Sequence, residues 1–368
     1  MRTPLSSRLP GFPWDSLANA RAKAQSHPGG LVNLSVGTPV DDVAPSIQEA
    51  LAAAAHVPGY PTTVGTTELR QSIVDALARR YNMTGLDLDS VLPVIGTKEA
   101  IAYLPFLLGV DANCSLVIPE VAYPTYEVAG LVSGARIIRA DSLLQLGPES
   151  PTMMFINSPG NPTGKVLGID HLRKVVGWAR ERNVILCSDE CYLGLNWEEE
   201  EALSILDPRV CDGDHTNLLA IHSLSKTSNM AGYRAGYLAG DKQLIAELLE
   251  ARKHTGLMVP GPIQEAMVTA LKDDEQEKRQ YDIYEARRKK LLPAVVAAGF
   301  TVDESAAGLY LWVTRGEDCR ATVDWFAERG ILVAPGEFYG PKGQQHVRIA
   351  LTAPDERIDA AVERLSAN

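Results

Sequence analysis

From about residue 90, the chain repeats one pattern: an apolar strand, a polar loop and then a helix. Apolar runs at 91–95, 115–118, 152–156 and 184–188 each lead into a cluster of polar and turn-forming residues. Strands that alternate with helices form a mainly parallel sheet with helices on both faces. Ligands of such sheets bind at the carboxyl ends of the strands. We therefore expect an α/β fold whose polar clusters converge at one edge of the sheet.

The last third of the chain has a different character. Long helical segments between 241 and 298 are followed by short apolar runs at 300–302, 308–313, 331–334 and 347–351. Short strands mixed with helices indicate a second, smaller α/β unit. We predict three regions: an N-terminal arm and helix (1–30) that packs with the small domain, a large ligand-binding domain (31–250) and a small C-terminal domain (251–368).

The segment from Ser223 to Arg234 contains a single lysine, Lys226, among small and hydroxylated residues. The apolar run 218–221 before it reads as a buried strand, which delivers the lysine into the protein interior. Burial favours the neutral amine, the form that attacks an aldehyde. Ser223, Ser225 and Arg234 suit an anion beside it, so a phosphorylated aldehyde such as pyridoxal phosphate fits the segment. A solvated surface loop with an ordinary ion pair is the alternative.

Asp189 ends the apolar run 184–188, where a solvated carboxylate is out of place. A buried carboxylate needs a cationic partner, and a protonated pyridine nitrogen or an internal Lys or Arg would serve. Tyr192 lies three residues further on and is placed to bond a ring hydroxyl. Tyr123 follows another strand and is a candidate to stack on the ring, although plain packing also accounts for an isolated tyrosine.

Three further clusters suit an anionic ligand. Gly96-Thr97-Lys98 stands at a strand-to-helix turn, where backbone N–H groups hold phosphate well. The segment from Asn157 to Gly164 has more turn formers than a turn needs, and Asn161 is suited to donate to a ring oxygen. Arg348 lies inside the apolar run 347–351, so it needs an anion: a substrate carboxylate or an internal glutamate.

Bulk properties exclude several classes of protein. The 368 residues are 45% hydrophobic and 22% charged, typical of a soluble globular chain, and suffice for two domains. A net charge of -11 argues against binding to nucleic acid or to a membrane surface. We find neither a bilayer-spanning run nor a signal-peptide core and expect a cytoplasmic protein. The five cysteines include no Cys-x-x-Cys pair, and Cys187, Asp189 and Cys191 do not make a zinc site, so no metal is predicted.

Taken together, the order and spacing of these segments resemble the class I/II aminotransferases of the fold-type I pyridoxal-phosphate enzymes over nearly the full length. The positions that match are Gly37 in Ser-Val-Gly-Thr-Pro, Tyr60 and Gly65 before Glu68-Leu-Arg70, Asn161-Pro-Thr-Gly164, Asp189 with Tyr192, Ser223-x-Ser-Lys226, Arg234 and Arg348. The resemblance implies a large domain with a mainly parallel, seven-stranded sheet between helices, and pyridoxal phosphate as the cofactor.

The resemblance also implies roles for individual residues. Lys226 would form a Schiff base with the cofactor and then shuttle protons. The remaining cofactor contacts would be Asp189 on the pyridine nitrogen, Tyr192 and Asn161 on the ring hydroxyl, Tyr123 on the ring face, and Gly96, Thr97, Lys98, Ser223, Ser225 and Arg234 at the phosphate. Arg348 would bind the α-carboxylate of amino-acid and keto-acid substrates, near Gly37 and Asn161. Tyr60 would reach the cofactor phosphate of a neighbouring subunit, which implies a homodimer with shared sites.

Several segments resemble the actinobacterial succinyldiaminopimelate aminotransferases more closely. They are 9–15, 58–63, 188–193, 222–226 and 333–340. This resemblance implies amino transfer from L-glutamate to N-succinyl-2-amino-6-oxopimelate, a step toward diaminopimelate and lysine. The candidates to bind the succinyl carboxylate are Arg8, Lys98, Arg252 and Lys253.

Other functions stay open at this stage, because a scaffold alone does not define a reaction. One is amino transfer to aspartate, alanine or aromatic acceptors. Another is β-elimination, which releases pyruvate and ammonia without a keto acid. A third is non-catalytic binding of pyridoxal phosphate in the sensor half of a regulator.

Overall fold

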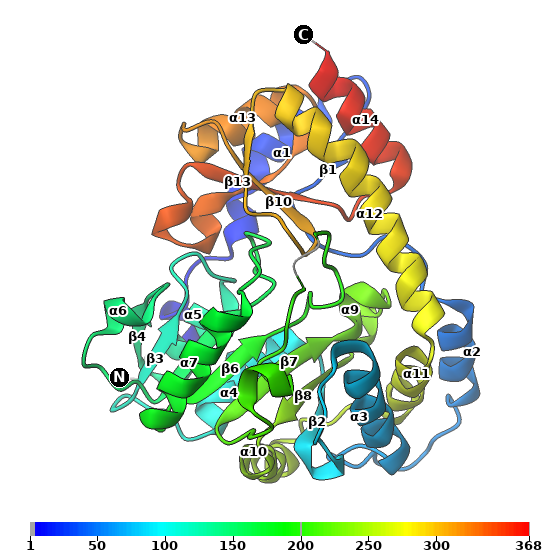
Figure 1. Ribbon diagram of the computed structural model, residues 1–368. Helices are drawn as coiled ribbons and strands as arrows, with labels where there is room; N and C mark the ends of the chain where they lie inside the picture. The colour runs from blue at the N-terminus through cyan, green and yellow to red at the C-terminus, as the bar shows by residue number, and fades with distance from the viewer. Residues whose placement is uncertain (1–3, 199–200, 368) are drawn as a thin grey trace.

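A seven-stranded sheet forms the centre of the lower part of the molecule in Figure 1, a computed structural model that describes residues 4–198 and 201–367. Its strand order is β2-β8-β7-β6-β5-β3-β4. The strands are β2 (Val91–Val94), β3 (Ser115–Ile118), β4 (Arg136–Arg139), β5 (Met153–Asn157), β6 (Ile185–Asp189), β7 (Leu218–Ser223) and β8 (Gly236–Gly240). β8 runs antiparallel to both of its neighbours, and the other pairs are parallel. The predicted mainly parallel α/β sheet is confirmed.

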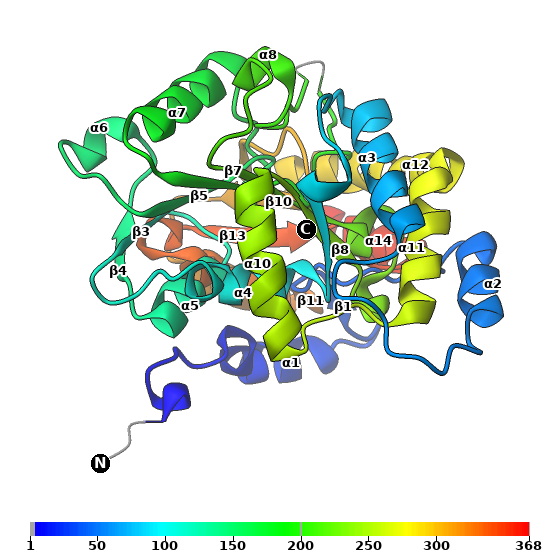
Figure 2. The same cartoon turned by 90° about the horizontal axis from the view of Figure 1, so that it is seen from below.

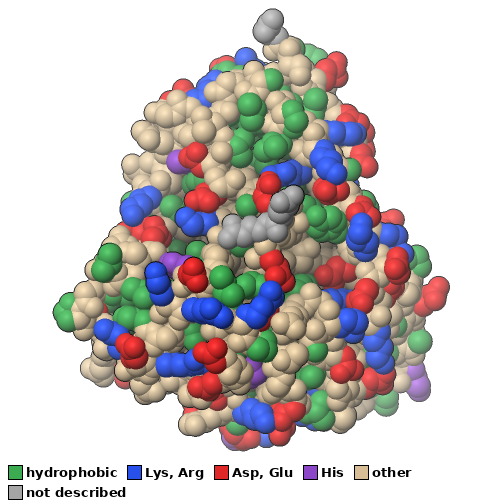
Figure 3. Space-filling model, viewed as in Figure 1, with side chains coloured by type: hydrophobic (Ala, Val, Ile, Leu, Met, Phe, Trp, Pro, Cys, Tyr) green, Lys and Arg blue, Asp and Glu red, His purple; other side chains and the backbone are tan. Residues whose placement is uncertain are grey.

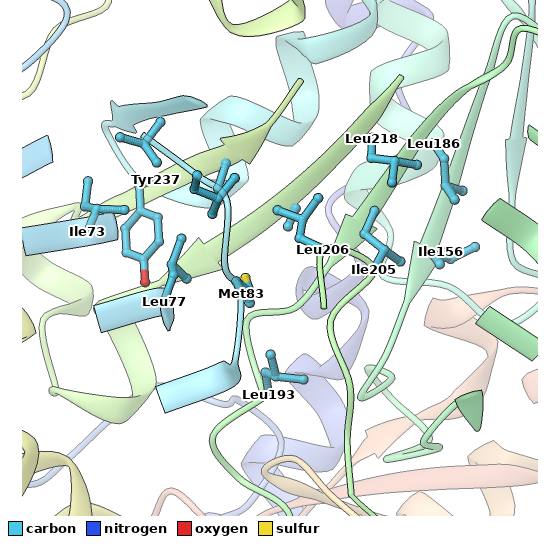
Figure 4. Packing of buried hydrophobic residues seen from close by; sticks show 14 of the residues in the cluster. Ile73, Leu77, Met83, Ile156, Leu186, Leu193, Ile205, Leu206, Leu218 and Tyr237 are labelled. Atoms are coloured by element: carbon cyan, nitrogen blue, oxygen red, sulfur yellow. The ribbon is translucent and has the colours of Figure 1, made fainter. Parts of the chain in front are cut away.

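Helices cover both faces of this sheet, as Figure 2 shows. α3 (Thr67–Tyr81) and α7 (Ile169–Glu181) lie on one face, and α4 (Thr97–Leu107), α5 (Thr125–Ser133) and α10 (Lys242–Thr255) lie on the other. Because side chains alternate along a strand, each strand supplies both cores. Met154 and Ile156 pack with the first group of helices, while Met153 and Phe155 pack with the second. Figure 4 shows part of the first core, with Ile156 near Ile205 and Leu186, and with Ile73 and Leu77 of α3 near Tyr237 of β8.

A smaller antiparallel sheet lies above the first and has the order β12-β13-β10-β9. Its strands are β9 (Thr301–Asp303), β10 (Tyr310–Thr314), β12 (Ala334–Pro335) and β13 (His346–Ala350), and β1 (Val32–Asn33) pairs separately with β11 (Ile331–Leu332). α13 (Cys319–Glu328) packs against α1 (Ala18–Gln25), and α12 (Asp274–Ala297) packs against α14 (Asp355–Ser366). α11 (Gly261–Lys272) ends directly before Asp273. The side chain of Asp273 caps the start of α12, so the two helices are separate.

The remaining short helices lie in the connections. They are α2 (Pro45–Ala53), α6 (Leu143–Leu146), α8 (Pro208–Cys211), α9 (Leu224–Thr227) and the 3-10 turns η1 (Leu5–Ser7), η2 (Pro13–Leu17), η3 (Leu88–Ser90), η4 (Ala231–Tyr233), η5 (Gly336–Tyr339) and η6 (Pro341–Gly343). The division into 1–30, 31–250 and 251–368 stays a prediction. Its second boundary falls inside α10.

The face seen in Figure 3 carries acidic and basic side chains mixed together, with apolar side chains between them. Among the described residues, no helix combines the length and the apolar character needed to cross a bilayer.

Candidate active site

A cavity of about 550 Å³ opens where the loops after the central strands face the smaller sheet. Most of the residues that the sequence singled out line it: Gly37, Thr97, Lys98, Tyr123, Asn161, Asp189, Tyr192, Ser223, Ser225, Lys226, Arg234 and Arg348. These residues come from several loops and strands that are far apart in the chain. The carboxyl ends of the parallel strands bring together residues such as Asp189 and Lys226, as expected for this type of sheet, while Arg348 reaches the cavity from β13 of the small sheet.

Two of the predicted cofactor contacts, Gly96 and Tyr60, do not line the cavity. Gly96 lies behind it, with φ +87°, and a Cβ at this position would collide with the guanidinium of Arg234. The glycine therefore makes room for Arg234 and begins α4. Tyr60 is 99% exposed and lies outside the lining of the cavity in its own chain.

Lys226 lies in the single turn α9, which follows β7 directly. The Ser223 hydroxyl caps this turn by accepting a hydrogen bond from the Ser225 N–H at 3.1 Å. The Lys226 ammonium donates to the Gly37 carbonyl. Burial lowers the pKa of Lys226, and the charges of Arg348 and Arg234 act in the same direction. The neutral, nucleophilic form of the Lys226 amine is therefore populated at a lower pH than in an ordinary lysine.

Asp189 is the last residue of β6 and is 5% exposed. Its Oδ2 accepts a hydrogen bond from the Tyr126 hydroxyl at 2.7 Å, and its Oδ1 accepts one from the Cys191 N–H at 3.2 Å. Burial raises the pKa of Asp189, and the bonds from Cys191 and Tyr126 oppose that shift. No Lys or Arg among the described residues pairs with Asp189, so the alternative of an internal salt bridge is not seen there and the carboxylate lacks a cationic partner.

The loop after β5 is held by Asn157, the first residue of the turn-rich segment that the sequence singled out, although Asn157 itself was not predicted as a site residue. Its amide donates to the Asp189 carbonyl at 2.8 Å and to the Pro159 carbonyl at 3.0 Å. Its side-chain oxygen accepts the Asn161 N–H at 2.7 Å. These bonds tie Asn161 to the end of β6, so Asn161 and Asp189 share one rigid frame.

Arg348 is 3% exposed on β13. Its Nη1 donates to Asn161 Oδ1 at 3.0 Å, its Nη2 donates to the Ser35 carbonyl at 2.8 Å, and its Nε has no partner in the structure. The guanidinium stacks 3.9 Å above the Tyr310 ring. No carboxylate pairs with Arg348 within the described ranges. A buried guanidinium with a vacant donor is suited to binding a carboxylate.

A second group of cations faces the start of α4. Lys98 Nζ lies 3.3 Å from the Thr125 hydroxyl and 5.6 Å from the centre of the Tyr123 ring. Burial lowers the pKa of Lys98, and the neighbouring Arg234 adds to the shift. Neither cation has an acidic partner in the part of the chain that the structure describes. Together with the N–H groups at the start of α4, these two cations are suited to hold a phosphate.

Several lining residues were not predicted as site residues. Tyr310 on β10 bonds the Tyr192 hydroxyl at 3.0 Å, and a Cβ on Gly37 would collide with its hydroxyl. Phe12 and Trp14 line the cavity together with Arg21 of α1. Nothing in the sequence marked Arg21 as a site residue, since an arginine on a short helix is ordinary and α1 lies far from Lys226 in the chain.

Of the four residues predicted as candidates to bind the succinyl carboxylate, three do not line the cavity. The prediction for Arg252 is wrong, because this side chain is buried and pairs with Glu99 through two 3.1 Å hydrogen bonds. Lys253 pairs with Glu250 along α10 and does not reach the cavity. Arg8 is also absent from the lining, which leaves Lys98 of the four.

The charges of the cavity define its ligand. Five cations and one carboxylate line it, namely Arg21, Lys98, Lys226, Arg234, Arg348 and Asp189, in a chain of net charge -11. Lys98 and Arg234 suit a phosphate, Lys226 suits an aldehyde, and Asp189 suits a basic ring nitrogen. A ligand that carries all three groups matches the cavity. Arg348 remains for the carboxylate of a second molecule. This fold and this site define a pyridoxal-phosphate enzyme that acts on amino acids.

The family model for aminotransferases of class I and II matches residues 30–365, and the chain belongs to this family. A probable aminotransferase of Mycobacterium tuberculosis is 63% identical over 362 residues, which are 98% of this chain and 86% of the relative. The 4-dedimethylamino-4-oxo-anhydrotetracycline transaminase OxyQ of Streptomyces rimosus is 50% identical over 97% of this chain and 99% of its own length.

More distant relatives are also named as aminotransferases. An LL-diaminopimelate aminotransferase of Aquifex aeolicus is 32% identical over 91% of this chain and 90% of its own length. The solved structure of an aminotransferase from Neisseria meningitidis has a TM-score of 0.88 at 28% identity and covers 99% of both chains. The protein is therefore an aminotransferase of the fold-type I class, and the class depends on pyridoxal phosphate.

Proposed function

We propose that this aminotransferase moves the amino group of L-glutamate to N-succinyl-2-amino-6-oxopimelate, as a cytoplasmic homodimer. The observation that carries the assignment to α-amino and α-keto acids is Arg348, a buried guanidinium with a vacant donor in the cavity that contains Lys226. The acceptor is supported by the resemblance of segments such as 9–15 and 333–340 to succinyldiaminopimelate aminotransferases. The relative that acts on LL-diaminopimelate gives further support.

Bound pyridoxal phosphate supplies an aldehyde that exchanges amino groups and a ring that accepts electrons from the substrate. In our proposal Lys226 Nζ would hold this aldehyde at rest, and the same amine would serve as the base that takes a proton from the substrate α-carbon and returns one. Asp189 would pair with the ring nitrogen and favour its protonated form, and the Tyr126 hydroxyl fixes that carboxylate with a 2.7 Å hydrogen bond. Arg348 holds the α-carboxylate, so that the α-carbon faces Lys226.

The proposed roles of the other residues follow their positions in the cavity. Thr97, Lys98, Ser223, Ser225 and Arg234 hold the phosphate, and Gly96 supports Arg234 from behind. Asn161 and Tyr192 contact the ring hydroxyl, and Tyr123 covers the ring face. Tyr60, 99% exposed in its own chain, is free to reach a neighbouring subunit.

A second candidate is amino transfer to a large cyclic ketone. It is favoured by one observation, the 50% identity to a transaminase named for 4-dedimethylamino-4-oxo-anhydrotetracycline. The aromatic rings of Phe12 and Trp14 at the cavity are compatible with such an acceptor. The two lining cations that the proposed cofactor contacts leave over, Arg348 and Arg21, favour the succinylated acceptor, because they suit a substrate with more than one carboxylate.

The test is a two-step absorbance experiment on the purified holoenzyme. L-glutamate should convert the aldehyde form of the cofactor to the amine form, and N-succinyl-2-amino-6-oxopimelate should restore the aldehyde form. Oxaloacetate, pyruvate, phenylpyruvate and an anhydrotetracycline ketone serve as competing acceptors. If one of these restores the spectrum with a higher kcat/KM, the proposed acceptor is wrong. Release of pyruvate and ammonia without a keto acid would instead indicate a β-lyase.

A further inference from the structure

Arg21 differs from the other basic residue of its helix. It is half-buried, lines the cavity, and has no hydrogen bond or ion pair with any other described residue. Lys23, two positions further along α1, lies outside the cavity and pairs with Glu328 at 2.8 Å. α1 therefore carries one cation that forms a surface ion pair and one that lines the cavity without an ion pair among the described residues.

The segment before α1 is fixed in place, so Arg21 is positioned in advance. Trp14 packs against Phe338 with ring centres 5.3 Å apart, and the Ser16 hydroxyl accepts a hydrogen bond from Arg320 at 2.9 Å. The Trp14 indole N–H and Arg348 Nη2 both donate to the Ser35 carbonyl, at 3.4 Å and 2.8 Å. The N-terminal segment is thus tied to the same backbone atom as the guanidinium that we assign to the substrate α-carboxylate.

The other cations of the cavity already have assignments in the proposed function. Lys226 holds the aldehyde, Arg234 and Lys98 face the phosphate position, and Arg348 takes the α-carboxylate. Arg21 is left over, and an acceptor with a second, remote carboxylate supplies the missing charge. Phe12 and Trp14, with ring centres 5.6 Å apart, add an apolar wall to the same cavity. Such a wall suits the methylene groups that separate the two ends of a long substrate.

We propose that Arg21 is a specificity-determining residue that binds the terminal carboxylate of the acceptor's succinyl group, while Phe12 and Trp14 contact the aliphatic linker. This inference rests on the proposed function for its substrate class. On this inference the N-terminal segment selects acceptors that carry a remote carboxylate over acceptors that lack one. The bond is a charge-assisted guanidinium–carboxylate pair, which forms two parallel hydrogen bonds in its best geometry.

The experiment compares Arg21→Gln with the matched control Lys23→Gln, which removes a charge from the same helix outside the cavity. Each holoenzyme is assayed with N-succinyl-2-amino-6-oxopimelate and with the analogue whose succinyl carboxylate is replaced by a carboxamide. For Arg21→Gln, kcat/KM should fall roughly 10- to 100-fold on the carboxylate and change little on the carboxamide. Arg21→Lys should restore part of the preference, and Lys23→Gln should behave as the wild type.

A binding measurement provides a second readout. N-succinyl-2-aminopimelate lacks the reacting group, and its affinity can be measured by titration calorimetry. Arg21→Gln should weaken its binding by a similar factor, without weakening that of its carboxamide counterpart.

The outcomes separate the two proposals. If Arg21→Gln lowers kcat/KM equally on both acceptors, or leaves the preference intact, the inference about Arg21 is overturned even if the succinylated acceptor is the substrate. If the succinylated acceptor is not used at all, the same comparison is made with 2-oxoadipate and its terminal amide. A preference for the carboxylate that depends on Arg21 would then support Arg21 as the binder of a remote carboxylate, with a different acceptor from the one proposed, and a preference independent of Arg21 would overturn the inference.

Discussion

Replacing Asp189 with asparagine tests the centre of the site, because it removes a charge and preserves the shape. Asp189 accepts hydrogen bonds from the Tyr126 hydroxyl at 2.7 Å and from the Cys191 N–H at 3.2 Å. Asparagine can keep both contacts, since its oxygen accepts from Cys191 and its amide donates to the Tyr126 oxygen. The change therefore isolates the interaction between the carboxylate and a protonated ring nitrogen.

The expected loss follows from the burial of the pair. Two opposite charges about 4 Å apart attract each other by about 4 kcal/mol at an effective dielectric constant of about 20. A neutral amide recovers about 1 kcal/mol through an ordinary hydrogen bond. The remaining loss of about 3 kcal/mol corresponds to a roughly 100-fold weaker affinity for the cofactor. The catalytic rate should fall by at least as much, because an unprotonated ring accepts electrons poorly.

The stability of the cofactor-free protein should change in the opposite direction. Burial raises the pKa of Asp189, so its contribution to stability is present below its ordinary pKa and is lost as the pH rises through the higher, folded value. Above that folded pKa the wild type contains a buried carboxylate without a cationic partner among the described residues, and Asp189→Asn eliminates it. The substituted apoprotein should thus have an unchanged or higher Tm at pH 7, and the difference should narrow at lower pH.

The assay combines a fluorescence titration with the cofactor, steady-state turnover and thermal unfolding of the apoprotein and the holoenzyme. Asp75→Asn, a change at an exposed position of α3, is the control for removal of a negative charge. The reasoning is refuted if Asp189→Asn binds the cofactor within threefold of the wild type and keeps its turnover. It is also refuted if the Tm of the apoprotein falls by several degrees, because Asp189 would then be a structural residue.

Three further predictions concern other parts of the site. The rate at which the apoprotein captures pyridoxal phosphate should rise with pH and level off below 10.5, because burial lowers the pKa of Lys226; an inflection at or above 10.5 in stopped-flow traces would contradict this. Gly37→Ala should lower the Tm and the turnover at a cost of about 1–3 kcal/mol, since its Cβ would collide with the Tyr310 hydroxyl; unchanged melting and kinetics would show that Tyr310 moves freely. Mixing inactive Lys226→Ala subunits with Tyr60→Ala subunits should regenerate activity if sites are shared in a homodimer, and no gain after subunit exchange would argue against Tyr60 crossing the interface.

The strands that the sequence predicted are those with a strong apolar signal. The runs at 91–95, 115–118 and 152–156 fall on β2, β3 and β5 within one or two residues. β8 and β4 were not predicted. β8 reads Gly-Tyr-Leu-Ala-Gly, and both glycine and alanine are poor strand formers, so only its pairing with β2 and β7 stabilises it. β4 begins and ends with arginine and lies at the sheet edge, where polar side chains are tolerated.

The site residues that the sequence revealed and those that it missed also differ for a physical reason. Asp189 and Lys226 were found because a charged residue directly after a buried strand is costly to bury and rarely contributes to packing alone. Tyr126 and Tyr310 were missed because an aromatic residue in a helix or strand usually only packs, and nothing in the sequence aims its hydroxyl. Arg21 was missed for another reason: an arginine on a short helix is ordinary, and only the three-dimensional structure places it at the cavity.

The unpaired charges of the cavity link its chemistry to the stability of the fold. Arg348 and Asp189 are almost fully buried without an opposite charge among the described residues, and each such group costs stability until a ligand pairs with it. A phosphate beside Arg234 and a ring nitrogen beside Asp189 would relieve part of this cost, and a substrate carboxylate beside Arg348 would relieve more. Ligands that bind only the folded state stabilise it in proportion to their affinity. The cavity should therefore be the region whose local stability depends most on the cofactor. Hydrogen exchange at Asn157, Ser223 and Ser225 should slow on cofactor binding, while exchange in the small sheet around β10 should slow further only when a dicarboxylate is added.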